Sequence, residues 1–289
     1  MATTEALGIG RLGHADLPAA LGLSAEAGWN QTADDWRLFL DHGRVFACRN
    51  QDGMPMATAA ILPYGRFAWI SMVLVTAGMR QRGLGTALLK HCIAELRRDG
   101  LTPLLDATPA GEHVYLPLGF KPIFGMTRWQ GETARQAAAQ DSGRNIAGPI
   151  ATATAMDAGA LGSAAMLDAA AFGAPREFLL QSLLGRAPDL ALRLKEHSFV
   201  LARPGRLATQ IGPLVANDEA AALALLQTVL ARLDGPVFLD VPDRWQRLQA
   251  ALRQLGCTVQ RSFRRMALGR DEAFGDPARC FVVAGPEFG

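Results

Sequence analysis

Residues 73 to 86 read Val73-Leu74-Val75-Thr76-Ala77-Gly78-Met79-Arg80-Gln81-Arg82-Gly83-Leu84-Gly85-Thr86, and an apolar-periodic run, 87–98, follows at once. The β-branched residues that begin this stretch predict a strand. Apolar residues at positions 88, 89, 92, 93 and 96 recur at the spacing of one helix face. The stretch is therefore expected to form a strand, a short glycine-containing loop and a helix, which is the layout of an anion-binding turn.

The start of such a helix can bind an anion because its first backbone N–H groups have no partner inside the helix and lie at the positive end of the helix dipole. Gly83 and Gly85 lack a Cβ atom, so a phosphate group can approach the backbone closely. Arg80 and Arg82 add positive charge. A Walker P-loop is excluded because no Gly-Lys-Ser/Thr is present, and the dinucleotide motif lacks its third glycine.

Two segments carry a family resemblance. Residues 80–85, Arg80-Gln81-Arg82-Gly83-Leu84-Gly85, resemble the Arg/Gln-x-x-Gly-x-Gly/Ala signature of the GCN5-related N-acetyltransferases (GNAT). Residues 115–120, Tyr115-Leu116-Pro117-Leu118-Gly119-Phe120, resemble that family's Tyr-x-x-Leu-Gly-Phe segment. A glycine turn that merely starts a helix is the alternative for the first motif taken alone, and the second motif argues against it.

The resemblance implies acetyl-CoA as the cofactor and assigns roles to residues. In the family, backbone groups of the strand and loop hold the acetyl-pantetheine arm and the diphosphate, which here points to Val73, Leu74, Val75, Arg80, Gln81, Arg82, Gly83, Leu84, Gly85 and Thr86. Tyr115 matches the family's usual general acid, and the alternative is a tyrosine that packs on the cofactor without proton transfer. Ala77 is a departure, because many members have proline there.

The general base and the acceptor site are less defined. Ser71 is the polar side chain near the middle of strand 67–75, where many members keep a glutamate. A water chain or a carboxylate could deprotonate the amine, and the candidate carboxylates are Glu112, Asp34 and Asp106. Candidate substrate residues are Trp29, Asn30 and Ser71. Trp36 is expected to pack in the core, and arginines 261, 264 and 265 are expected to lie on a solvated strand face, with an acidic ligand as the alternative.

Composition limits the function classes. The chain has 289 residues, 49% hydrophobic and 19% charged, which fits an ordinary globular protein with two domains. A net charge of +2 predicts no strong affinity for nucleic acid or a membrane surface. The four cysteines and five histidines show no metal-ligand spacing, so no metal site is predicted and the thiols are expected to be reduced. With no signal or membrane segment evident, the cytoplasm is the expected location.

The pattern of elements predicts the same mixed fold twice. In the first half, strands are expected at 7–14, 45–49, 56–62, 67–75, 103–106 and 121–129, with helices at 16–27, 32–43, 87–98 and 111–118. In the second half, strands are expected at 150–154, 190–196, 199–203, 207–216, 237–241 and 258–268, with helices at 157–171, 175–184, 218–233 and 243–255. The fold class is therefore α/β (α+β), with two tandem GNAT folds, each a mixed, mostly antiparallel sheet flanked by helices.

The second copy is expected to be degenerate. It has Asn217-Asp218-Glu219-Ala220-Ala221-Ala222 where the first copy has its glycine loop, and carboxylates repel a diphosphate. This organisation, with the stretches Gly28-Trp29-Asn30-Gln31-Thr32, Asp35-Trp36 and Ala171-Phe172-Gly173-Ala174-Pro175-Arg176, resembles the tandem, YitH-like members of the family. The predicted domains are an N-terminal GNAT domain at 1–131 that binds acetyl-CoA, a linker at 132–147, and a degenerate GNAT-like domain at 148–289.

The sequence thus predicts an acetyl-CoA-dependent N-acetyltransferase that acts on a small amine or amino-acid-like acceptor by direct transfer in a ternary complex. Two alternatives stay open: a non-catalytic acyl-CoA-binding or regulatory module, and a protein N-acetyltransferase. The expected partner is a small-molecule amine, with no nucleic acid and no membrane. A monomer with an internal pseudo-dimer, or a weak homodimer, is the expected state.

Overall fold

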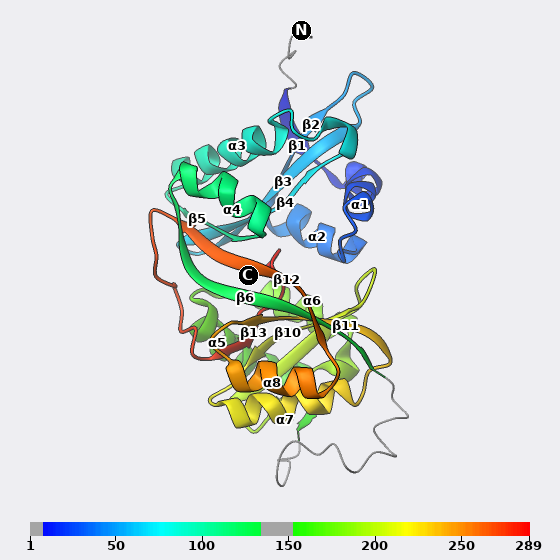
Figure 1. Cartoon of the computed structure of the whole chain (residues 1–289), viewed down its shortest axis with the longest axis vertical. Helices are drawn as coiled ribbons and strands as arrows, with labels where there is room; N and C mark the ends of the chain where they lie inside the picture. Colours follow the sequence, from blue (N-terminus) through cyan, green and yellow to red (C-terminus); the bar gives the residue numbers. More distant parts are fainter. Residues whose placement is uncertain (1–7, 134–152) are drawn as a thin grey trace. The chain divides into compact units, whose positions relative to one another are not determined.

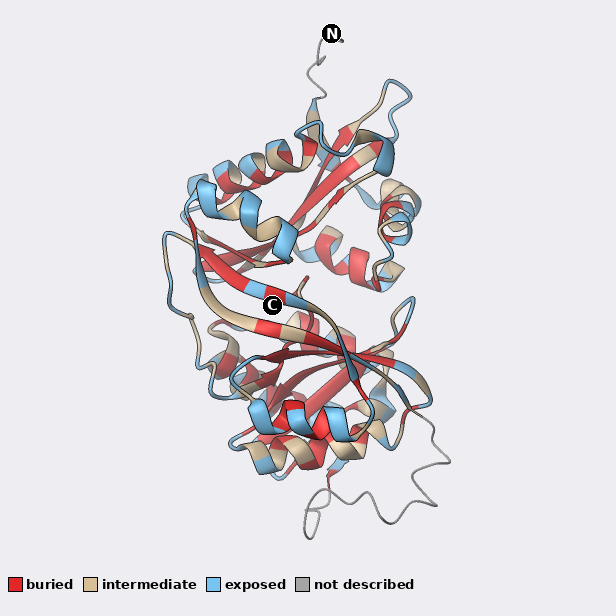
Figure 2. Cartoon of the chain, in the orientation of Figure 1, coloured by how far each residue is buried: buried red, intermediate tan, exposed pale blue. Residues whose placement is uncertain are grey.

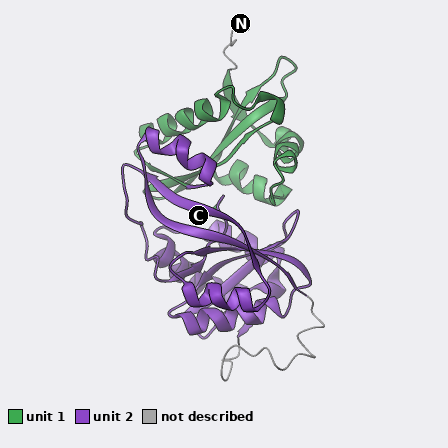
Figure 3. Ribbon diagram, viewed as in Figure 1, with its two compact units in different colours: residues 1–105, 288 green, residues 106–287, 289 purple. Residues whose placement is uncertain are grey.

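The computed structural model describes residues 8–133 and 153–289, which divide into two compact units (Figures 1 and 3). The first unit comprises the chain up to Leu105 together with Phe288, and the second comprises residues 106–287 and Gly289. Each unit is a mixed, mostly antiparallel sheet with helices packed on it, which confirms the predicted fold class. Part of the predicted strand at 150–154 and residues 134–147 of the predicted linker lie outside the described residues, whereas Glu132 and Thr133 belong to a strand.

The first unit follows the predicted order of elements closely. It contains β1 (Ile9–Leu12), α1 (Leu17–Glu26), α2 (Ala33–His42), β2 (Arg44–Arg49), β3 (Pro55–Tyr64), β4 (Phe67–Val75), α3 (Leu84–Arg98) and β5 (Thr102–Ala107), the last two residues of β5 belonging to the second unit. The strands lie in the order β1-β2-β3-β4-β5 and are antiparallel except for the parallel pair β4–β5.

Local chemistry explains the helices of this unit. Asp35 Oδ2 accepts a hydrogen bond from the Thr32 N–H (2.8 Å), and the Thr32 hydroxyl accepts one from the Asp35 N–H (3.5 Å), so the predicted capping box begins α2. The predicted apolar stripe of α3 is buried against β3 and β4. Trp36 and Trp69 are fully buried, as is typical of core side chains.

The second unit contains more elements than the predicted second copy. They are α4 (Pro109–Tyr115), β6 (Phe120–Thr133), β7 (Thr154–Ala155), α5 (Leu161–Phe172), α6 (Glu177–Arg186), β8 (Leu192–Leu194), β9 (Ser198–Arg203), β10 (Thr209–Val215), α7 (Glu219–Leu230), β11 (Gly235–Pro242), α8 (Gln246–Gln254), β12 (Thr258–Leu268) and β13 (Cys280–Val282). The sheet order is β12-β6-β11-β10-β9-β8-β7, and β13 pairs with β10. Strand β13 was not predicted.

Strand β6 explains why the compact units divide at residue 105 and not near residue 131. Although β6 belongs to the first half of the sequence, it is antiparallel to β11 along one edge and to β12 along the other. Its hydrogen bonds therefore bind it to the second unit. The compact units are defined by contacts in space, so β6 is grouped with the strands to which it is hydrogen-bonded. The predicted domains are defined by the repeated order of elements along the sequence, so their boundaries stay a prediction.

The core of the second unit lies under α7 and α8. Trp129, Leu239 and Val241 project from one face of the sheet into a cluster with Leu225 and Leu248 of these helices, and all five are buried. Figure 2 shows the strands mostly buried and the exposed residues concentrated on helices and loops.

The four cysteines are free thiols, and burial raises the pKa of Cys92 to about 12 and of Cys280 to about 11.

Candidate functional site

The loop that leads into α3 leaves the first turn of this helix open. Gly83 is the N-cap residue, with a left-handed backbone (φ 79°), and it has no side chain to accept the first N–H groups. By contrast, Thr32 caps α2 and Thr108 caps α4 through their side chains. The N–H groups of α3 that come first are therefore available to an external acceptor, as the sequence predicts for a diphosphate.

Glu26 holds this loop in place, and no sequence motif had indicated it. Its carboxylate accepts hydrogen bonds from the Ala77 N–H (2.5 Å) and from the Thr76 hydroxyl (2.8 Å). Arg80 also has a structural contact, because its Nε donates to the Val75 carbonyl oxygen (3.1 Å). Arg82 remains an exposed cation at the loop. Arg80 is exposed as well, so both predicted arginines keep their charge at the surface, and they differ in that Arg80 is bonded to the end of β4.

Glu26→Gln is expected to weaken acetyl-CoA binding about threefold at pH 7, because the loop loses charge-assisted hydrogen bonds. The bond from Ala77, followed by that from Thr76, lowers the pKa of Glu26 below its usual 4.5. The carboxylate's contribution is therefore present above pH 4.5 and is lost as the pH falls through the lowered value. Calorimetric titrations from pH 7 downward should show wild type and variant converging in affinity at acid pH, and a constant gap would contradict this account.

The edge of β4 that faces β5 is hydrogen-bonded to a neighbouring strand only in its first part. The two strands pair only from Phe67↔Thr102 to Trp69↔Leu104, and no other described residue pairs with β4 on that side beyond Trp69. Val73, Leu74 and Val75 come after the last residue of β4 that pairs with β5. Their backbone on this edge can therefore bind a ligand in place of a neighbouring strand. The predicted cofactor strand and the predicted diphosphate loop are brought together within one unit.

Gly85 packs against this strand. A Cβ atom added at Gly85 would lie 3.6 Å from Val75 Cγ2 and 3.7 Å from Val73 Cγ1. The side chains of these valines therefore support α3, and only their backbone groups remain for a ligand. The small glycine keeps the start of α3 close to β4.

The middle of β4 is irregular, and Ser71 lies at the irregularity. The register with β3 shifts between Thr58 and Ala60, and Met72 has a positive φ of 52°, which is unusual for a residue with a side chain. The hydroxyl oxygen of Ser71 is buried without a hydrogen-bond partner. Strain and an unpaired buried polar atom are typical of a functional site.

The connection between α1 and α2 carries the other predicted substrate residues. Asn30 is 6% exposed, and the Trp29 N–H donates to the Ser24 carbonyl oxygen (2.9 Å). Gln31, which was not predicted as a substrate residue, is also 6% exposed, and its Oε1 atom has no hydrogen-bond partner among the described residues. Trp36 is a core residue, as predicted, and donates from Nε1 to the Ser24 hydroxyl (3.0 Å).

Tyr115 belongs to the second unit, at the end of α4. Its ring contacts Phe120 (centroids 6.0 Å apart), and burial raises its pKa above the usual 10.0. The phenol is therefore protonated at neutral pH. A Cβ atom added at Gly111 would lie 2.9 Å from Tyr115 Cε2 and 3.3 Å from the hydroxyl oxygen. Glycine at position 111 thus leaves the space that this ring occupies.

The three candidate bases differ in their surroundings. Asp106 accepts two hydrogen bonds from Arg265 (2.9 Å each), and Asp34 accepts one from Arg37 (2.5 Å). Glu112 lies 3.7 Å from Arg264, at the limit of an ion pair. Asp106 is therefore committed to a bidentate structural pair, and the geometry singles out no carboxylate as the base.

The corresponding site of the second copy is filled by the chain itself. Asp218 caps α7, the counterpart of α3, and its carboxylate accepts the Ala221 N–H (2.8 Å). The parallel pairing of β10 with β11 also ends early, at Ile211↔Leu239. Here, however, β13 pairs with β10, and the Val283 N–H donates to the Asp240 carbonyl oxygen of β11 (3.0 Å). Both places that remain open in the first copy are occupied in the second.

Comparisons with known proteins agree with this arrangement. An acetyltransferase (GNAT) family model matches residues 18–120, and an acetyltransferase (GNAT) domain model matches residues 164–281. Over 243 residues, 24% are identical to the uncharacterized N-acetyltransferase YitH of Bacillus subtilis (strain 168), with 82% of each chain covered.

Solved structures share the fold of the whole chain. A protein from Pyrococcus horikoshii superposes with a TM-score of 0.81 at 18% identity and covers 100% of this chain and 98% of its own. A tandem GNAT protein from the clavulanic acid biosynthesis pathway superposes with a TM-score of 0.63 at 15% identity, over 90% and 97% of the two chains. Within the described residues, no helix has the length and apolar character needed to cross a membrane.

Proposed function

This chain belongs to the GCN5-related N-acetyltransferase family, as two GNAT domains in tandem, and we propose that it transfers an acetyl group from acetyl-CoA to the amine of a small, amino-acid-like acceptor. The observation that carries the proposal is the uncapped start of α3 behind the left-handed Gly83, beside the open edge of β4. Acetyl-CoA would supply an activated thioester, and the loop from Arg80 to Thr86 would hold its diphosphate through backbone N–H groups.

The residues of the chain would then bind the cofactor and the acceptor and would donate a proton. The backbone of Val73, Leu74 and Val75 would bind the pantetheine arm in place of a neighbouring strand. Tyr115, protonated at neutral pH, would donate the proton from its hydroxyl to the departing thiolate, and the proton that the amine loses to water as the amide forms would restore the phenol through solvent. Ser71 would offer its unpartnered hydroxyl to the acceptor. The acetyl group would pass directly from the thioester to the amine, within a ternary complex of protein, acetyl-CoA and acceptor.

One acetyl-CoA is expected to bind per chain. Asp218 already fills the N-terminus of α7, and like charge repels a diphosphate there. Calorimetric titration of acetyl-CoA into the purified protein measures this directly. A stoichiometry of one supports a single site in the first copy, and a stoichiometry of two would show that the second copy also binds. Absence of binding would overturn the proposed function.

Gly111→Ala is expected to lower kcat about tenfold with little change in the KM for acetyl-CoA, because the added methyl group displaces the Tyr115 ring. Stability should not fall much, since alanine favours a helix by about 1 kcal/mol over glycine. Gly22→Ala is the matched control, because its Cβ would meet nothing within 4 Å. Steady-state kinetics of the two variants test this, and an unchanged kcat in Gly111→Ala would contradict it.

A further inference from the structure

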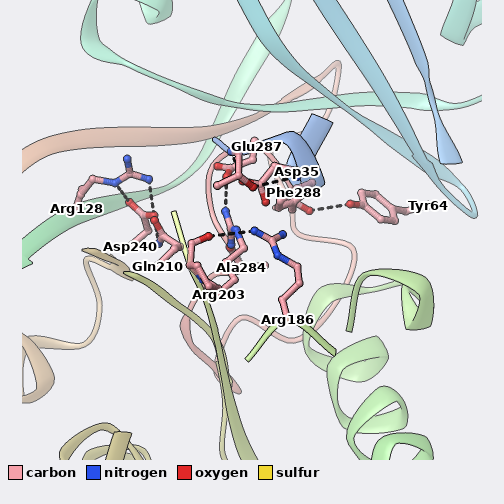
Figure 4. A network of polar contacts seen from close by, with 12 residues as sticks. Asp35, Tyr64, Arg128, Arg186, Arg203, Gln210, Asp240, Ala284, Glu287 and Phe288 are labelled. Atoms are coloured by element: carbon pink, nitrogen blue, oxygen red, sulfur yellow. Dashed lines mark hydrogen bonds and ion pairs between the residues drawn. The ribbon is translucent and has the colours of Figure 1, made fainter. Parts of the chain in front are cut away.

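A row of polar side chains crosses one face of the sheet in the second unit. Arg128 of β6 lies directly opposite Asp240 of β11 on one side and Arg261 of β12 on the other. Residues that face each other across a ladder project to the same side of the sheet. Gln210 of β10 joins the row by donating a hydrogen bond to Asp240 (3.0 Å; Figure 4).

The carboxylate of Asp240 is already paired within this row. It accepts two hydrogen bonds from Arg128 (2.8 Å each) in addition to the one from Gln210, and its side chain is completely buried. The other buried arginines of the unit have their own carboxylates. These pairs are Arg203–Glu287, which Figure 4 also shows, Arg265–Asp106 and Arg176–Asp168.

Arg261 differs from all of these arginines. Its side chain is partly buried, and among residues 8–133 and 153–289 it has no hydrogen bond and no ion pair. The charges that act on it are those of Arg128, which repels it, and of Asp240, which Arg128 already neutralises. Burial and then Arg128 lower the pKa of Arg261, as expected for a cation without a counter-ion. Like charges directly opposite each other destabilise a ladder, and the row of Gln210, Asp240, Arg128 and Arg261 carries one net positive charge.

We propose that Arg261, beside Arg128, binds the carboxylate of a small organic acid. A guanidinium group presents its N–H donors in a planar fork that matches a carboxylate, and one net positive charge matches a monoanion better than a phosphate dianion. The rings of Phe238 and Phe263 are buried against Arg128, with their centroids 5.4 and 5.3 Å from its guanidinium carbon, and make the surroundings of the row apolar. The site lies in the second unit and does not depend on acetyl transfer.

The probes are benzoate, its neutral analogue benzamide and inorganic phosphate, titrated calorimetrically into the full-length protein at low ionic strength. Benzoate is expected to bind saturably, and benzamide and phosphate at least tenfold more weakly. Arg261→Gln should weaken benzoate at least tenfold. Arg264→Gln is the matched control from the same strand, because Arg264 already lies near Glu112, and it should stay within twofold of wild type.

Thermal unfolding separates a binding role from a structural one. Without ligand, Arg261→Gln should be as stable as wild type or more stable, because the repulsion with Arg128 is removed, and benzoate should raise the Tm of wild type but not of this variant. The proposal is overturned if benzoate does not bind wild type, if Arg261→Gln keeps the wild-type affinity, if both arginine variants lose affinity equally, or if phosphate binds in place of benzoate.

Discussion

Gly83→Glu is expected to weaken acetyl-CoA binding roughly 100-fold, or ~2.7 kcal/mol. Two effects act together at this position. Gly83 has a φ of 79°, a conformation that disfavours residues with a side chain, and it lies directly before the free N–H groups of α3. A carboxylate placed there would cap the helix from within, as Asp218 does for α7, and would repel the diphosphate.

Two companion variants separate backbone strain from charge. Gly83→Asn introduces a side chain that tolerates the left-handed conformation but carries no charge, so its loss of affinity should be several-fold smaller. Gly78→Ala, in the same loop, should bind like wild type, because its φ is not positive and a Cβ there meets nothing within 4 Å. Calorimetric titration gives the affinities and circular dichroism checks the fold. If Gly83→Glu bound acetyl-CoA like wild type, the cofactor would not lie at this loop.

The glycine loop and most elements could be predicted because their signals are local. Two such signals are the capping box of Thr32 and Asp35 and the apolar stripe of α3. Each depends on residues that are close together in the sequence, and the structure has both where the sequence predicts them. The carboxylate at Asp218 was expected to disfavour a diphosphate by its charge. The structure adds that this carboxylate is the helix cap itself.

Pairings between distant residues could not be predicted from such signals. Strand β6 joins β11 and β12 across more than 100 residues, and a short apolar segment such as β13 carries no pattern that identifies its neighbours. The pair of Arg128 with Asp240 is of the same kind. A single sequence has no periodicity that links two such charges. The arginines of β12 were therefore expected on a solvated face, with an acidic ligand as the alternative, whereas Arg265 is buried against Asp106.

The residues that support the candidate site were missed for a related reason. Glu26 ends a helix in the sequence and supports the loop 50 residues further on, and Gln31 is distinguished only by a buried oxygen without a partner. Hydrogen-bond satisfaction is a property of the folded chain and is invisible in composition. The catalytic candidate Tyr115 could be found from the sequence because it is part of a motif. Kinetic measurements on a variant test its role.

Tyr115→Phe is expected to lower kcat about 100-fold, within the range that general acid catalysis contributes, and to leave the affinity for acetyl-CoA nearly unchanged. The substitution removes only the hydroxyl group and keeps the ring that contacts Phe120. The expected separation of kcat from binding distinguishes a proton donor from a packing residue. Purified variants assayed by thiol release with a library of amines, together with calorimetry, provide both quantities.

The pH profile supplies the sharper test of Tyr115. A general acid must be protonated, and burial raises the pKa of Tyr115 above 10.0, so kcat of the wild type should not decline on the alkaline side until the pH exceeds about 10. Tyr115→Phe should lack this decline and remain low throughout. An equal kcat in variant and wild type would remove Tyr115 from the mechanism. Wild-type protein that binds one acetyl-CoA but acetylates no amine would instead favour the non-catalytic alternative, in which the open start of α3 serves to sense acyl-CoA.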